Sequence, residues 1–127
     1  MLKREVLSVP GVPAHANPIP QAVKLDRFVF SSLVTGRDAA TNTYPDSMEA
    51  QVKNAFASMR ALLASAGATP ANIGLLTIYL NNRADRVHVN PAWLEMFPDE
   101  KDRPARMTLK MELDDGAKIM MSFTAVL

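Results

Sequence analysis

The stretch that most restricts the fold of this chain is residues 73–80, Ile-Gly-Leu-Leu-Thr-Ile-Tyr-Leu, which is almost wholly apolar. Its short length suits a β-strand, and a strand without polar alternation has to be covered on both of its faces. The chain has 127 residues, which suits one domain, and neither an internal repeat nor a linker divides it. We therefore expect a single domain over residues 1–127, with residues 73–80 as a central strand.

An amphipathic helix is expected just before this strand, at about residues 47–66. Asp46 and Glu49 have the spacing of a capping box, in which each side chain bonds a free backbone N–H at the start of a helix. Gly67 can adopt the left-handed conformation that ends a helix, and Pro70 prevents its continuation. The apolar residues of this segment recur every three or four positions and form one stripe: Met48, Val52, Phe56, Met59 and Leu63.

The remaining elements are a short second helix and four strands. Proline is tolerated at the first position of a helix but not in its interior, so Pro91 predicts a helix over residues 91–97 that is capped by Asn90. The Asp-Gly pair in residues 114–117 predicts a β-hairpin between the last two strands. The strands are expected at residues 3–8, 28–32, 105–113 and 118–126.

This order of elements lacks the strict strand-helix alternation of a doubly wound sheet. We therefore predict an α+β fold in which both helices pack on one face of a mixed sheet. The last strand, residues 118–126, carries apolar side chains on both of its faces. Its second face is accordingly expected to be covered, and another subunit could do this.

Composition excludes several kinds of site. The chain has no cysteine, and its two histidines, His15 and His88, lie far apart, so we expect no thiol chemistry and no metal site. A net charge of +1 with dispersed charges gives no support for binding to nucleic acid or to an anionic membrane. The sequence has no glycine-rich phosphate loop, no signal-peptide core and no run near the ~18 apolar residues that span a bilayer. A cytoplasmic protein is therefore expected.

Several stretches resemble the RidA (YjgF/UK114) family. Residues 85–98, which include Val89-Asn90 and Phe97-Pro98, are similar to the family's D-F-x-x-V-N-x-x-Y-x-x-F-F segment. Residues 103–106, Arg-Pro-Ala-Arg, are similar to its P-A-R motif at the head of a strand, and the final segment follows in the same order. Upstream, residues 17–32 are similar to its G-P-Y-x-Q…I-x-x-S-G pattern. The resemblance covers nearly the whole chain.

The resemblance implies a chorismate-mutase-like (ferredoxin-like) α+β fold that assembles as a homotrimer. The three sheets would form a central barrel with the helices outside, and the ligand pockets would lie in the clefts between subunits. Typical members are hydrolases that deaminate reactive 2-imino or enamino acids to keto acids and ammonia, a form of metabolite damage control. They use neither a metal nor an organic cofactor.

Arg106 is the first candidate for chemistry. A guanidinium is permanently charged and matches a carboxylate with two parallel hydrogen bonds, and the resemblance implies that it anchors the substrate carboxylate. The structural alternative is a surface arginine or an ion pair with Glu112 or Asp99. Thr108 lies about 6–7 Å further along the same strand face, where the family commonly has cysteine. It could line the pocket as a second catalytic-site residue or simply be a strand residue.

Three further residues are candidates for substrate binding. Ser32 matches the family's serine at the end of the second strand, but Leu33 follows it in place of glycine. Asn90 matches the family's asparagine, although capping is its expected role. Trp93 is expected in the core, with the cleft as the alternative.

Two departures from the family pattern bear on mechanism. Ile19 replaces a tyrosine that would contact the ligand, and Met120 replaces a glutamate thought to position the attacking water. Methionine cannot accept a proton. His15 could substitute from a neighbouring subunit, whereas Glu112 lies about 20 Å from Arg106 along an extended strand. Arg37 and Asp38 lie in a loop that could fold over a cleft.

Two classes of function follow from these residues. The first is an enzyme that deaminates an enamine or imine carboxylate, including a specialised form with a wider, more apolar pocket formed by Ile19, Met120 and Trp93. The alternative is a catalytically silent trimer that binds a small carboxylate.

Overall fold

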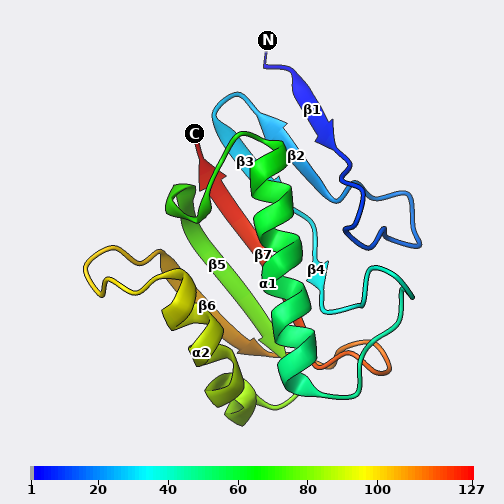
Figure 1. The fold of residues 1–127 in the computed structure, drawn as a ribbon. Coiled ribbons are helices and arrows are strands. Elements are labelled where there is room, and N and C mark those ends of the chain that lie inside the picture. The colour runs from blue at the N-terminus through cyan, green and yellow to red at the C-terminus, as the bar shows by residue number, and fades with distance from the viewer. Residues whose placement is uncertain (1) are drawn as a thin grey trace.

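The computed structural model describes residues 2–127 and contains one mixed, seven-stranded sheet (Figure 1). The strand order is β1-β2-β3-β7-β5-β6, and β4 pairs with β7 beyond the end of β3. The apolar segment is a central strand with the expected bounds, and β7 and β6 lie on its two sides. The strands are Arg4–Leu7 (β1), Ala22–Leu25 (β2), Phe28–Ser31 (β3), Val34–Thr35 (β4), Ile73–Leu80 (β5), Ala105–Lys110 (β6) and Ile119–Val126 (β7).

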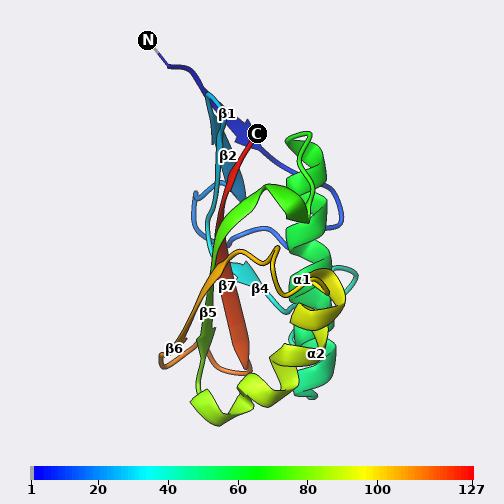
Figure 2. The ribbon, with the colours of Figure 1, turned by 90° about the vertical axis from the view of Figure 1, so that its left-hand side faces the viewer.

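Both helices pack on the same face of this sheet, which confirms the predicted α+β arrangement (Figure 2). The helices are Met48–Ser65 (α1) and Arg86–Met96 (α2), and the short 3₁₀ turns Pro70–Asn72 and Arg83–Asp85 lie before β5 and α2. The core forms between α1, α2 and the sheet, and it includes Met59, Leu63, Leu76 and Met121, all fully buried. None of the helices described in residues 2–127 combines the length and apolar character needed to cross a membrane.

The ends of α1 follow the expected chemistry, with one correction. Gly67 has a φ of 77°, the left-handed conformation expected after the helix. The N-cap, however, is Ser47, because its Oγ accepts a 3.0 Å hydrogen bond from the N–H of Ala50. The predicted capping box with Asp46 is wrong because the helix begins one residue later than that spacing requires.

The predicted β-hairpin between the last two strands is also wrong. A turn does occur at residues 114–117, where Gly116 has a φ of 86°, but β5 lies between β6 and β7. The apolar β5 needs a neighbour on each edge, and the β5-α2-β6 connection places β6 parallel to it. The chain must therefore cross the end of β5, where Asn81 bonds the N–H of Leu113 at 2.8 Å and the carbonyl of Ala117 at 2.6 Å.

The helix α2 begins at Arg86, so the prediction that Asn90 caps a helix over residues 91–97 is wrong. Pro91 lies inside the helix and cannot donate to the carbonyl of Val87. The helix nevertheless continues to Met96. The sequence did not predict two strands. They are β2, whose four residues Ala-Val-Lys-Leu do not alternate between apolar and polar, and β4, which has only two residues.

The face of the sheet opposite the helices is apolar and open. Cross-strand register brings Phe28 beside Val126 and Met107 beside Thr77 on this helix-free face. Five of its large apolar side chains are at least 36% exposed: Phe28, Phe30, Met107, Leu109 and Val126.

Candidate functional site

The side chains of Arg106, Thr108, Asn90 and Trp93 form one cluster at the edge of the sheet. Arg106 Nε donates a hydrogen bond to Thr108 Oγ1 at 3.0 Å, and Arg106 Nη1 donates to Asn90 Oδ1 at 2.9 Å. The guanidinium carbon lies 5.2 Å from the centroid of the Trp93 ring, within cation–π distance. Four of the residues predicted from the sequence are therefore brought together; we call them the Arg106 cluster.

The fold builds this cluster from two neighbouring elements. Arg106 and Thr108 are two positions apart on the edge strand β6, so they share a face, and register with the buried Leu76 turns that face toward the helices. Asn90 and Trp93 are three positions apart on α2 and therefore face the same way.

Asn90 and Trp93 each contact the Arg106 guanidinium in addition to their place in α2. Asn90 lies inside α2, where its side chain is free to accept from Arg106 rather than cap a helix. Trp93 belongs to the buried core, as expected, and packs against Phe97 with ring centroids 4.9 Å apart. Its ring also contacts the guanidinium, so one side chain joins the core to the cluster.

Within residues 2–127, no carboxylate neutralises the charge of Arg106. Burial lowers the pKa of Arg106 below its ordinary value, and no charged neighbour in residues 2–127 contributes to this shift. The predicted alternative of an ion pair with Glu112 or Asp99 is therefore not supported. Because an arginine remains protonated even after such a shift, the site holds a half-buried cation whose contacts within the described chain are neutral.

The remaining predicted residues lie elsewhere. Met120 pairs with Thr35 and Tyr79 on the helix-free face, where it is only 5% exposed. Ile19 is 47% exposed, and Ser32 bonds Gln21 through its backbone N–H. Within residues 2–127, none of these three is a hydrogen-bond or cation–π partner of Arg106.

Met120 lies in a shallow depression of about 210 Å³, which we call the Met120 depression. Side chains of four segments of the chain meet there, and the ionisable ones are His15, Arg37, Glu112 and Asp114. Arg37 also lies 4.8 Å above the ring centroid of Tyr44. Sequence reasoning did not predict that Arg37 lies beside Met120, because the loop that carries it has no periodic pattern. Asp38, which we expect in a loop over the cleft, accepts a hydrogen bond from the N–H of Ala40 through its carboxylate.

The Tyr44 hydroxyl is buried and has no hydrogen-bond partner in the described chain. Burial raises the pKa of Tyr44, and Arg37 partly opposes the shift. The phenol is therefore neutral at physiological pH.

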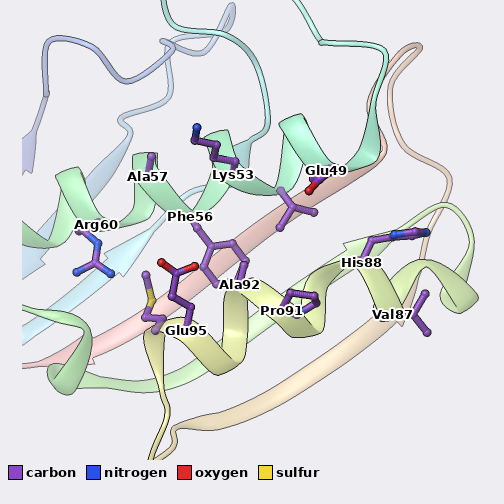
Figure 3. Close-up of a pocket in the computed structure, with 12 residues that line it drawn as sticks. Glu49, Lys53, Phe56, Ala57, Arg60, Val87, His88, Pro91, Ala92 and Glu95 are labelled. Atoms are coloured by element: carbon purple, nitrogen blue, oxygen red, sulfur yellow. The ribbon is translucent and has the colours of Figure 1, made fainter.

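A larger groove of about 560 Å³ lies between α1 and α2, on the outer side of the molecule (Figure 3). Phe56 forms part of its floor, while Arg60 extends from α1 and Glu95 from α2. None of the residues predicted to bind substrate lines this groove. In residues 2–127, no group of three or more His, Asp or Glu side chains is arranged to hold a metal ion.

Comparison with known proteins supports the resemblance. Residues 11–127 match the family model described as Endoribonuclease L-PSP. The chain is 33% identical to Reactive Intermediate Deaminase A from Arabidopsis thaliana, over 99% of this chain and 67% of that protein. It is 29% identical to a 2-iminobutanoate/2-iminopropanoate deaminase from Dermatophagoides farinae, over 100% and 99% of the two chains.

The same relationship holds at the level of the fold. A crystal structure of a Rid-family protein of unknown function from Yersinia pestis superposes with a TM-score of 0.90 at 23% identity, covering 98% of this chain and 100% of that one. Together with the family model, which spans the strands and helices that build the Arg106 cluster, this likeness identifies the chain as a member of the RidA (YjgF/UK114) family.

Proposed function

We propose that the protein hydrolyses a small enamine or imine that carries a carboxylate, releasing a keto compound and ammonia. The observation that carries this proposal is the half-buried, uncompensated guanidinium of Arg106. The names of the relatives, which include 2-iminobutanoate/2-iminopropanoate deaminase, support the class of substrate.

Arg106 suits a carboxylate because much of its donor capacity is unused. Two of its five N–H groups donate to Thr108 and Asn90, which leaves three for a ligand. Those two bonds and the Trp93 ring hold the guanidinium in place, so little side-chain entropy is lost on binding. Thr108 and Asn90 then act by positioning Arg106, and the Thr108 hydroxyl could also bond the substrate.

We further infer that a complete site needs more than one copy of the chain. Arg106 and Met120 lie on opposite faces of one sheet, so they cannot line one pocket within a single copy. The exposed apolar residues of the helix-free face support its burial against other copies. In the homotrimer that the family suggests, the Arg106 cluster of one copy would meet Met120, Ile19 and Ser32 of another.

Acceleration of this reaction needs mainly an oriented substrate and a nearby positive charge rather than a strong catalytic group. Imines hydrolyse readily in water, so holding the carboxylate beside an ordered water accelerates the reaction. Met120 can contribute an apolar wall but cannot accept a proton. Because Met120 stands where a proton-accepting residue was expected, a silent carboxylate-binding trimer of the same fold is the second candidate.

Turnover separates the two candidates. An amino-acid oxidase acting on alanine would generate 2-iminopropanoate in situ, and its loss would be followed spectroscopically with and without protein. We expect acceleration by the wild type, near-complete loss in Arg106→Ala, and wild-type rates in the control Arg60→Ala, which removes an exposed arginine of α1. Tight binding of 2-oxobutanoate without any acceleration would favour the silent binding protein.

A further inference from the structure

Hydrolysis of an imine includes proton transfers that orientation alone does not speed, and the Arg106 cluster contains no side chain that can carry these protons. Water must lose a proton as it attacks carbon, and the departing nitrogen must gain one. None of the side chains in the cluster acts as an acid or a base near neutral pH, since they are those of arginine, threonine, asparagine and tryptophan. Any side chain that carries these protons therefore lies outside the cluster.

The Met120 depression contains an imidazole, that of His15. Imidazole is the side chain whose ordinary pKa lies closest to neutrality, which is where a general acid–base works best. The only other histidine, His88, is exposed on α2 and lines the groove between the helices instead. Arg37, Glu112 and Asp114 also face the depression, so His15 has both a cation and two carboxylates around it.

The segment that carries His15 is held against the sheet. Gln21 is buried, and its side chain accepts a 2.8 Å hydrogen bond from the N–H of Val9 and donates a 3.0 Å bond to the carbonyl of Val12. Val12 in turn donates to the carbonyl of Val9 at 3.2 Å. Prolines on both sides of His15, Pro13 and Pro18, restrict the backbone further. His15 is therefore half-buried at a defined position rather than on a free loop.

We propose that His15 is the acid–base group of this reaction and acts on a substrate whose carboxylate is held by Arg106 of another copy. This inference rests on the proposed function and on its intersubunit site. The substrate reacts as its iminium, in which nitrogen already carries the proton. The imidazole takes a proton from water as the oxygen bonds to the iminium carbon, and the electron pair of the C=N bond moves to nitrogen to give a neutral amino alcohol. The imidazolium then donates its proton to the amine; the C–N bond breaks as the C=O bond forms, the hydroxyl proton returns to the imidazole, and ammonia leaves.

The first test is chemical rescue. With 2-iminopropanoate generated in situ, His15→Ala should lower kcat about 100-fold, the usual loss when a general acid–base is removed. Added imidazole should restore part of that rate in His15→Ala and leave the wild-type rate unchanged. His88→Ala is the matched control and should retain wild-type kcat. Melting temperatures and circular dichroism would check that each variant is folded.

The second test is mixing of subunits. Arg106→Ala and His15→Ala are each expected to be inactive alone, but a mixed trimer contains a cleft that combines an intact Arg106 from one copy with an intact His15 from another. Random assembly of a 1:1 mixture should restore about one quarter of the wild-type sites. Residues that acted within the same copy would give no restoration.

The outcomes separate this inference from the proposed function. A wild type that turns over and a His15→Ala variant with unchanged kcat would overturn the role of His15 alone. Loss of activity that neither imidazole nor subunit mixing restores would assign His15 a structural role and also overturn it. A wild type without turnover would overturn both proposals.

Discussion

Asn90 accepts a 2.9 Å hydrogen bond from the guanidinium of Arg106, so a residue of α2 fixes the position of a cation on the edge strand β6. The helix–sheet packing is thereby coupled to the geometry of the proposed carboxylate site. Asn90 is exposed and makes no other side-chain hydrogen bond in the described chain, which makes it a clean point at which to test this coupling.

Asn90→Ala should raise KM for an imino acid several-fold, with a smaller effect on kcat. The variant loses one bond that positions Arg106 but none to the substrate itself, so the effect on KM should be smaller than the roughly 10-fold or more that the full ~1.5–3 kcal/mol of a hydrogen bond to a charged group would give. Steady-state kinetics on 2-iminopropanoate would measure both constants. Asn72→Ala, which removes an amide that bonds the Val126 carbonyl far from Arg106, is the control. An unchanged KM in Asn90→Ala would argue against a positioning role.

Met120→Glu should raise kcat for 2-iminopropanoate. A carboxylate in the Met120 depression could orient water, whereas methionine cannot. Met120 is 5% exposed, so the new charge should also lower the melting temperature. Met120→Gln has nearly the same shape without the charge, and kcat should not rise in that variant. Equal rates in the two variants would contradict the explanation.

Met107→Glu should weaken self-association of the protein. The side chain is 47% exposed on the helix-free face, and a carboxylate there would remain unpaired when other copies cover it. Light scattering coupled to gel filtration would report the mass. The control is Val87→Glu, since Val87 is 61% exposed on α2 and lies outside that face. A trimer that persists in Met107→Glu at low micromolar concentration would show that this face is not the interface.

Gly36→Ala should destabilise the fold by about 1–3 kcal/mol, the range for overpacking a closed site. A Cβ at Gly36 would lie 2.6 Å from the carbonyl oxygen and 2.9 Å from the Cα of Gln51, and neither backbone atom can move without shifting α1. Thermal or urea unfolding would measure the loss. Gly74→Ala is the comparison, because its nearest neighbour would be 3.9 Å away. Equal stability of the two variants would contradict the steric argument.

The sequence by itself determined the elements whose signals are local. The apolar stripe of α1 depends on contacts between residues three or four apart in the sequence. The residues of β5 are almost all apolar, which by itself indicates a buried strand. Both segments were therefore predicted nearly to their ends. Gly67 likewise ends α1 through its own φ. The family pattern around Arg106 also pointed to four side chains that the fold does bring together.

Only the tertiary structure decided which strands are neighbours and which face each side chain occupies. The Asp-Gly turn is compatible with a hairpin or with a loop that crosses the end of another strand. It is a crossing loop here because β5 lies between β6 and β7 and pairs with both. Local rules place Pro91 at the first position of a helix and therefore make Asn90 its cap. Because α2 starts at Arg86 instead, Asn90 lies inside the helix and bonds Arg106. Arg106 and Met120 lie on opposite faces of the sheet because of the register of β6, β5 and β7. This register joins residues far apart in the sequence, so no short stretch of sequence could have predicted it.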